Sequence, residues 1–241
     1  MYGSVLHLPE NNRTDKTIGG VFMSVYFFSG KPGSGKSLHA AKMIDQWVRK
    51  GRNVIANFPV NDNFWAKKRR QDKLGKVIMV TNEELLKYGI RGLVGYASQF
   101  HKRQPDGQMI EKQTLVIIDE CQTIFNSRSW NTKGRSDWIS MFTQHRKFGF
   151  EFLLISQDKV FVDKQIRAVF EWDYEHRNLK KFKTFGWLLS LVLGGNFFIV
   201  VVKSMSVGKK DHTECLGASK RYYKLYDSYR LFDTTVLRAN Y

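Results

Sequence analysis

Residues 24–37 have the sequence SVYFFSGKPGSGKS, and this stretch decides the fold. Its first half, residues 24–28, predicts a short buried strand. Its second half matches the pattern G-x-x-x-x-G-K-[ST] with Gly30, Lys31, Pro32, Gly33, Ser34, Gly35, Lys36 and Ser37. Residues 37–50 then carry apolar side chains at helical spacing, at Leu38, Ala41, Ile44 and Val48. A strand, a glycine-rich turn and a helix in this order predict a phosphate-binding loop.

Each residue type in this loop has a chemical role. Glycines let the backbone wrap around a phosphate and permit positive φ angles. The exposed N–H groups and the helix N-terminus attract the anion. Lys36 reaches the β- and γ-phosphates, and Ser37 offers its hydroxyl to Mg²⁺. We predict that residues 30–37 bind ATP with Mg²⁺, although the sequence shows no base-reading motif of the N-K-x-D kind that would separate ATP from GTP.

Two adjacent acids follow an apolar strand later in the chain. Residues 114–118 are TLVII, and Asp119 and Glu120 come directly after them. A carboxylate at the carboxyl end of a parallel strand lies beside the phosphate loop in folds of this kind. We therefore predict that Asp119 holds Mg²⁺ through water. Glu120 is predicted to polarise the attacking water as a general base, which favours an ATPase that hydrolyses ATP for mechanical work.

Three further polar residues are candidates for catalysis. Gln157 ends the strand predicted at residues 150–155, where it would sense the γ-phosphate or cap a helix. Arg146 and Arg167 are candidates for an arginine finger that acts across a subunit interface. Ordinary salt bridges are the alternative for both arginines. His145 has no metal-binding companions, so a packing role is expected.

The order of elements predicts an α/β fold, a P-loop NTPase with a mostly parallel sheet and helices on both faces. Strands are expected at residues 24–28, 53–57, 76–80, 114–118, 150–155 and 171–177. Helices are expected at residues 37–50, at 136–147 and around 162–169, with a short one opened by a capping box at residues 81–84. Residues 92–113 are predicted to be an irregular insertion. The domain limits are a loose extension at 1–22, an ATPase core at 23–170 and a β-rich C-terminal extension at 171–241.

The composition favours a polyanionic partner. The chain has 241 residues and a net charge of +17, with basic clusters at residues 67–70, 180–183 and 209–210. Nucleic acid and an anionic membrane surface both fit this excess, and the alternative is a merely solubilising surface. Apolar residues make up 42% of the chain, which is enough to bury a core. The two cysteines, Cys121 and Cys215, have no metal-like spacing and are expected to be reduced thiols of a cytoplasmic protein.

Two segments allow two interpretations each. Residues 185–202 carry no charge, so they form either a membrane-spanning helix or two strands joined at Gly194-Gly195-Asn196. The C-terminal tyrosines alternate with basic residues, at Tyr222, Tyr223, Tyr226 and Tyr229. Such a mixture either stacks on single-stranded nucleic acid or packs as an amphipathic segment.

Taken together, these motifs resemble the N-terminal ATPase domain of the zonular occludens toxin family, which includes the gene I assembly proteins of filamentous phages. The resemblance spans residues 23–235 and rests on an ordered set: residues 23–26, the loop at 30–37, 54–57, 115–120, His145-Arg146, Ser156-Gln157 and Ile166-Arg167. It implies an ATPase at the inner face of the host inner membrane that helps to assemble and export the phage filament. It also implies partners: the single-stranded phage DNA–protein complex, coat protein and an outer-membrane channel.

Family members continue into a spanning helix and an extracytoplasmic part, which carries the toxin activity that gives the family its name. Residues 185–202 fall where the family has strands, which favours the hairpin. Toxin activity is not predicted for this chain. An arginine finger acting in trans would require a homo-oligomer. The alternatives are a soluble DNA-translocating ATPase, a small-molecule or nucleotide kinase, and a nucleotide-gated scaffold with little hydrolysis.

Overall fold

The computed structural model describes residues 25–66, 71–126, 132–179 and 197–226. Within these residues the strands form an eight-stranded sheet of order β3-β2-β4-β5-β1-β6-β7-β8. From β3 to β6 every neighbouring pair is parallel, whereas β7 and β8 are antiparallel to their neighbours. The bounds are β1 Val25–Ser29, β2 Asn53–Ala56, β3 Val77–Met79, β4 Thr114–Ile118, β5 Phe150–Ile155, β6 Trp172–Asn178, β7 Phe197–Ser204 and β8 Lys210–Gly217. The predicted mostly parallel sheet is confirmed.

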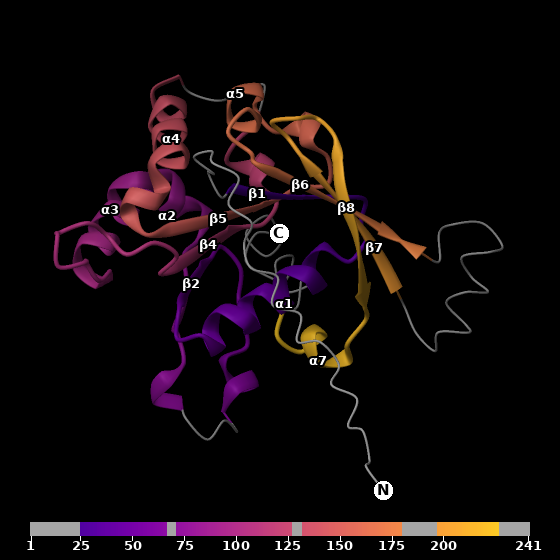
Figure 1. Cartoon of the computed structure of the whole chain (residues 1–241), viewed down its shortest axis with the longest axis horizontal. Coiled ribbons are helices and arrows are strands. Elements are labelled where there is room, and N and C mark those ends of the chain that lie inside the picture. The colour runs from indigo at the N-terminus through magenta and orange to yellow at the C-terminus, as the bar shows by residue number, and fades with distance from the viewer. Residues whose placement is uncertain (1–24, 67–70, 127–131, 180–196, 227–241) are drawn as a thin grey trace, which may run out of the picture.

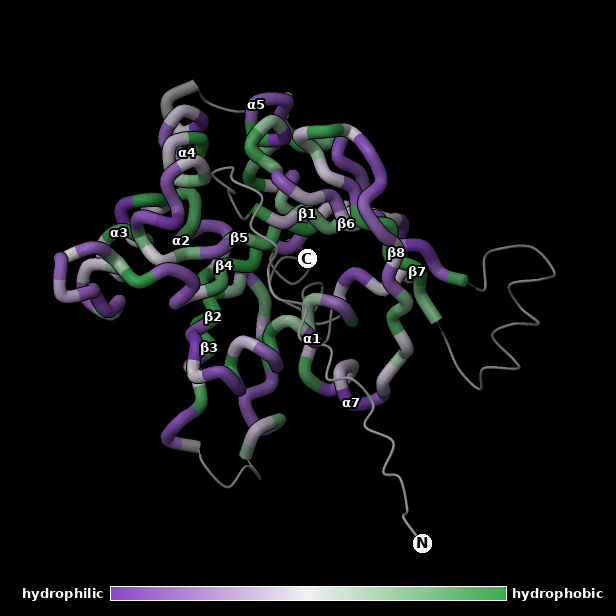
Figure 2. The backbone as a smooth tube through the Cα atoms, viewed as in Figure 1, coloured by the Kyte–Doolittle hydropathy of each residue, from purple (hydrophilic) through white to green (hydrophobic). Residues whose placement is uncertain are grey.

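The central strands are apolar on both faces because helices cover both. In β4, Leu115 and Ile117 pack in one core, and Val116 and Ile118 pack in the other. The first core includes the buried side of α1 (Lys36–Arg49). The second includes residues of α2 (Asn82–Lys87), α3 (Gly89–Phe100), α4 (Thr132–Gln144) and α5 (Lys164–Arg167). Figure 1 shows α1 and α7 (Lys220–Tyr223) below the strands and α4 above them, and Figure 2 shows the hydrophobic residues concentrated in β4 and β5. Full burial of both faces is what a parallel sheet requires.

The prediction for residues 92–113 is wrong in its first half, because Gly89–Phe100 is the helix α3. Gly92 and Gly95 are exposed on this helix, where each weakens it by about 1 kcal/mol relative to alanine. Leu93 and Ala97, one turn apart, are buried against the sheet. Burial of that face outweighs the poor helical propensity of the glycines.

The C-terminal strands extend the same sheet. The strand expected at residues 171–177 is β6, which pairs in parallel with β1 and antiparallel with β7. Of the uncharged segment 185–202, residues 197–202 belong to the strand β7, and residues 185–196 lie outside the described residues. No helix among the described residues is both long and apolar enough to span a membrane. The extension predicted at residues 1–22 and the basic clusters at 67–70 and 180–183 also lie outside the described residues.

Candidate functional site

The carboxyl ends of three neighbouring strands bring the predicted site residues to one edge of the sheet. Gly30 follows β1, Asp119 follows β4, and Gln157 lies two residues after β5. The strand β5 lies between β1 and β4. Because β5 is the neighbour of β1, the Gly30 N–H donates a hydrogen bond to the Gln157 carbonyl at 3.2 Å. Ligands bind outside this edge in open parallel sheets.

The backbone of the phosphate loop has the left-handed conformations that its glycines permit. The φ angles of Gly30, Gly33 and Gly35 are 138°, 73° and 99°. A Cβ atom at Gly30 would lie 2.4 Å from the carbonyl oxygen of His176, and one at Gly35 would lie 2.7 Å from the ring of Phe198. At these two positions, conformation and space both require glycine.

The loop presents unused hydrogen-bond donors. Gly35 precedes α1 and supplies no side-chain cap, and the first turn of α1 has no acidic residue. The first N–H groups of a helix have no partner inside the helix. The hydroxyl of Ser34 is buried and has no partner among the described residues. Lys36 Nζ folds back to the Gly30 carbonyl at 2.6 Å, and burial lowers the pKa of its ammonium. This donor set fits a phosphate.

Asp119 is buried and held on several sides. The side chain of Asn57 accepts from the Asp119 N–H at 2.7 Å and donates to the Asp119 carbonyl at 2.9 Å. Oδ1 of Asp119 accepts from the Glu120 N–H at 2.8 Å, and Oδ2 accepts from the hydroxyl of Tyr226. Burial raises the pKa of the Asp119 carboxyl, and the hydrogen bond from Tyr226 opposes that rise. Sequence reasoning missed Asn57 as a site residue, although it directly follows β2, the strand that pairs with β4 before Asp119.

The side chain of Tyr226 reaches the predicted magnesium ligands. Its hydroxyl contacts both Asp119 and Ser37, the two predicted magnesium ligands. The backbone of the preceding residue is fixed by a 3.0 Å hydrogen bond from the Asn61 N–H to the Leu225 carbonyl. The described residues contain no cluster of three or more histidine, cysteine or acidic side chains that could hold a metal. One carboxylate, one hydroxyl and substrate phosphates nevertheless suit Mg²⁺, which keeps several waters.

Glu120 has a strained backbone. Its φ is +47°, a conformation that is uncommon for residues other than glycine and that recurs at functional sites. Its carboxylate accepts a hydrogen bond from the Gln122 side chain. The charges of Asp119 and Glu120 both act on Lys36, so the predicted lysine and both acids share one site.

A pair of buried histidines lies next to the phosphate loop, between α1 and β6. His39 Nδ1 and His176 Nε2 are 3.0 Å apart, and the two residues join α1 to β6. Burial lowers the pKa of His39 to about 3 and that of His176 to about 4, so both rings are neutral at pH 7. Nothing in the sequence signals this contact, because 137 positions separate the two residues.

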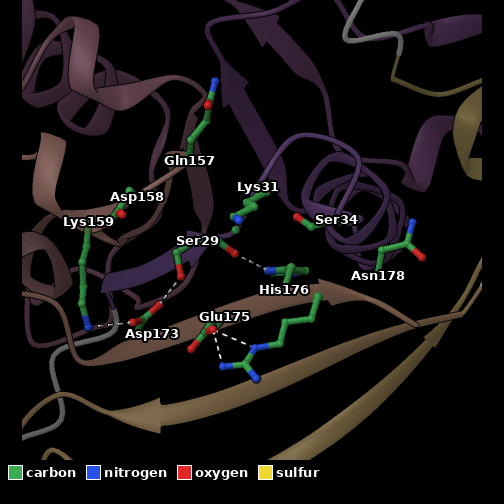
Figure 3. A pocket seen from close by; sticks show the side chains of 12 residues that line it. Ser29, Lys31, Ser34, Gln157, Asp158, Lys159, Asp173, Glu175, His176 and Asn178 are labelled. Carbon is green, nitrogen blue, oxygen red and sulfur yellow. Dashed lines mark hydrogen bonds and ion pairs between the residues drawn. The ribbon is translucent and has the colours of Figure 1, made fainter. Parts of the chain in front are cut away.

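Two cavities adjoin the loop on different sides. The first, of about 460 Å³, is lined by residues 33–38 together with Phe198, Tyr222, Tyr223 and Tyr226; we call it the aromatic cavity. The second, of about 450 Å³, is lined mostly by charged and polar side chains (Figure 3); we call it the charged cavity. Gln157, Lys31 and Asp173 line the charged cavity, where Asp173 accepts from Ser29 at 2.8 Å and pairs with Lys159 at 3.5 Å. Lys36 and Ser37 line the aromatic cavity, so the phosphates are expected there.

The arginine candidates lie away from these cavities. Arg146 pairs with Glu111 at 2.7 Å and precedes β5, at the opposite edge of the sheet from the loop. We therefore do not retain it as a finger. Arg167 ends α5, is half-buried, and lines neither cavity among the described residues. A role for Arg167 would have to be exerted on a neighbouring subunit.

Comparison with known proteins identifies relatives. The sequence pattern of the zonular occludens toxin (Zot) family matches residues 24–228. The Gene 1 protein of Enterobacteria phage I2-2 is 32% identical over 219 residues, which cover 88% of this chain and 56% of the relative. The Gene 1 protein of Enterobacteria phage fd is 31% identical over 221 residues, which cover 88% of this chain and 61% of the relative. The chain therefore spans little more than half the length of these relatives.

A solved structure has the same fold. The crystal structure of the N-terminal domain of zonular occludens toxin from Neisseria meningitidis has a TM-score of 0.50 and 16% identity to this chain. The alignment covers 86% of this chain and 100% of that domain. Together with the loop between β1 and α1, this likeness assigns the P-loop NTPase fold.

Proposed function

Because the chain belongs to the zonular occludens toxin family, we propose that it is a P-loop ATPase that powers assembly and export of filamentous phage particles at the bacterial inner membrane. One observation carries the ATPase part of the proposal. The loop that ends in Lys36 and Ser37 lies close to a buried Asp119 followed by Glu120, at the carboxyl ends of β1 and β4, the two strands on either side of β5.

The loop would bind the triphosphate. The N–H groups of residues 33–37 and the start of α1 would surround the phosphate oxygens. Lys36 would exchange its 2.6 Å contact with the Gly30 carbonyl for the β- and γ-phosphates. Ser37 and Asp119 would hold Mg²⁺, which neutralises charge that develops on the phosphates. For this, the hydroxyl of Tyr226 must leave its place between them.

Glu120 is the proposed general base. Its carboxylate would take a proton from the water that attacks the γ-phosphorus, while the bond to the leaving ADP oxygen breaks. Glu120 must first exchange its hydrogen bond with Gln122 for one with that water. Glu120 directly follows Asp119, so it lies at the same strand end as this proposed magnesium ligand.

Gln157 and Arg167 have proposed supporting roles. Gln157 would report the γ-phosphate to the rest of the sheet through its backbone, because its carbonyl accepts a hydrogen bond from the Gly30 N–H of the phosphate loop. Its exposed side chain lines the charged cavity, on the other side of the loop from the expected phosphates. Arg167 would act on the nucleotide of a neighbouring subunit in a homo-oligomer. The charged cavity adjoins the loop on the side away from the aromatic residues.

The proposed partners follow from charge and family. A net charge of +17 suits the single-stranded DNA–protein complex of a phage and an anionic membrane surface. Coat protein is the further partner proposed. The chain would act in the cytoplasm at the inner face of the host membrane.

A nucleotide-gated scaffold is the second candidate function, and one observation favours it. Glu120 is bound to Gln122, and Tyr226 lies between both magnesium ligands, so the arrangement described does not favour hydrolysis. A scaffold would bind ATP and change shape with little turnover.

The test is ATP hydrolysis by the purified chain, alone, with single-stranded DNA, and with anionic liposomes. Stimulation by liposomes supports the assembly and export ATPase. Stimulation by DNA alone supports a soluble DNA-translocating ATPase instead. Tight ATP binding without turnover in every condition would favour the scaffold and overturn the motor.

A further inference from the structure

The aromatic cavity has two chemically different ends. One end is the phosphate loop, with Ser34, Lys36 and Ser37. The other is a wall of rings from β7 and the C-terminal helix α7, formed by Phe198, Tyr222 and Tyr223. We propose that this aromatic wall binds the base of the nucleotide by stacking, with Tyr223 as the principal contact. The inference rests on the proposed function, since it concerns the same nucleotide.

The wall is built against the loop. The ring of Phe198 is buried and lies so close to Gly35 that a Cβ atom there would meet it at 2.7 Å. Phe198 also packs in one apolar cluster with Leu38, the residue after the magnesium-binding serine, and with Tyr222. An apolar surface therefore begins where the phosphate-binding residues end. A nucleotide that placed its phosphates on the loop would meet this surface with its base.

The three rings differ in how much of their surface is exposed to a ligand. Phe198 is 4% exposed. The ring centroid of Tyr222 lies 6.4 Å from that of Phe64 and 5.9 Å from the guanidinium carbon of Arg221. Tyr223 is 50% exposed and has no hydrogen bond or ring contact among the described residues. An exposed tyrosine ring beside a phosphate site is well suited to stack on a base, since every base has a π-face.

The size and lining of the cavity agree with this ligand. A volume of about 460 Å³ lies within the range of small-molecule sites. The described lining contains no amide or carboxylate side chain, so hydrogen bonds that would separate adenine from guanine are scarce. ATP and GTP are therefore expected to bind with affinities within about tenfold of each other, because stacking is tolerant of base identity.

The same observation accounts for tyrosines that the sequence left between two interpretations. Tyr222, Tyr223 and Tyr226 all line the cavity beside the phosphate loop. Tyr226 packs on Phe58, and Tyr222 packs against the apolar clusters, as the amphipathic interpretation expects. Tyr223 is the exposed ring of the three, and we assign it to the nucleotide.

The experiment compares ATP, GTP and inorganic tripolyphosphate, which has the phosphates but no base. Dissociation constants are measured by calorimetry with Mg²⁺ for the wild-type chain, Tyr223→Ala and Tyr223→Phe. Tyr223→Ala should weaken ATP and GTP by about tenfold and leave tripolyphosphate unchanged, and Tyr223→Phe should restore both nucleotides. Tyr88→Ala, which removes an exposed tyrosine far from both cavities, should change nothing.

Two results would overturn the proposal. One is ATP binding by Tyr223→Ala with wild-type affinity; the other is an equal loss of ATP and tripolyphosphate. Both leave the proposed ATPase function standing. Failure of the wild-type chain to bind either ATP or tripolyphosphate would instead overturn the proposed function, and the base site with it.

Discussion

The hydroxyl of Tyr226 donates a hydrogen bond to the carboxylate of Asp119, and the same hydroxyl contacts Ser37. The two residues that would hold magnesium are thus joined through Tyr226, which lies 107 positions after Asp119 in the chain. Burial and the nearby Asp119 charge raise the pKa of the Tyr226 hydroxyl, so it remains a donor at neutral pH. If Ser37 and Asp119 hold magnesium as proposed, entry of the metal would require the Tyr226 hydroxyl to move away from Asp119.

Tyr226→Phe should tighten metal binding in the presence of a nucleotide. The change removes the hydroxyl but keeps the ring that packs on Phe58 at 4.1 Å. Loss of a hydrogen bond to a charged group is worth about tenfold in affinity. The measurement is a Mn²⁺ titration at a fixed concentration of a non-hydrolysable ATP analogue, with Tyr88→Phe as control. Weaker metal binding by Tyr226→Phe would show that the hydroxyl helps to hold the ion.

Gly35→Ala should destabilise the fold and weaken nucleotide binding. Gly107→Ala is the matched control, because Gly107 also has a positive φ, of 86°, but a Cβ atom added there would meet no other atom within 4 Å. We expect about 1–2 kcal/mol of destabilisation at Gly107 from the left-handed conformation alone. Gly35→Ala should exceed this because its new methyl group meets Phe198. Urea denaturation measures the unfolding free energy of both variants. Equal losses of unfolding free energy in Gly35→Ala and Gly107→Ala would contradict the close packing of Phe198 on the loop.

Asn57→Ala should destabilise the chain by about 3 kcal/mol, because the buried N–H and carbonyl of Asp119 both lose their partner. Asn82→Ala removes only the neighbour that accepts from Asn57 at 2.8 Å, and it should cost less than about 1 kcal/mol. Urea unfolding of both variants is the measurement. A similar loss of unfolding free energy in Asn57→Ala and Asn82→Ala would mean that Asn57 does not position Asp119.

Local signals explain why much of the fold and of the phosphate loop could be predicted. Three features can each be recognised within about ten residues of sequence: the strand before Gly30, the helix after the phosphate loop and the apolar run before Asp119. Asn57, His176 and Tyr226 were not predicted as site residues, because their contacts join positions 62, 137 and 107 apart. The helix α3 was missed for a different reason: its glycines lower helical propensity, and only the packing of Leu93 and Ala97 against the sheet reveals it.

The stability should fall as the pH is lowered below 6.5. His176 has a pKa lowered to about 4 by burial, against an ordinary 6.5 in the unfolded chain. Above pH 6.5 the ring is neutral in both states; below it, only the unfolded chain takes up the proton until the pH approaches 4. This residue should therefore remove about 1.4 kcal/mol of unfolding free energy per pH unit within that window.

The measurement is urea unfolding at several pH values between 6.5 and 4.5. His176→Gln, which stays neutral, should show a slope shallower by about 1.4 kcal/mol per pH unit than the wild-type chain. His212 is exposed and its pKa is raised by hydrogen bonds to Asp211 and Glu214, so His212→Gln should not flatten the slope. Identical slopes for the wild-type chain and His176→Gln would show that His176 does not contribute to the pH dependence of stability.

The most direct test of the ATPase proposal measures binding and steady-state hydrolysis of ATP side by side in the wild-type chain, Lys36→Ala and Glu120→Gln. The account predicts turnover by the wild-type chain and weak binding with no turnover by Lys36→Ala. It predicts near-normal binding by Glu120→Gln, with turnover reduced by at least about a hundredfold. Wild-type turnover in Glu120→Gln would contradict the assignment of Glu120 as the base, and a wild-type chain that binds ATP without hydrolysing it would contradict the ATPase itself.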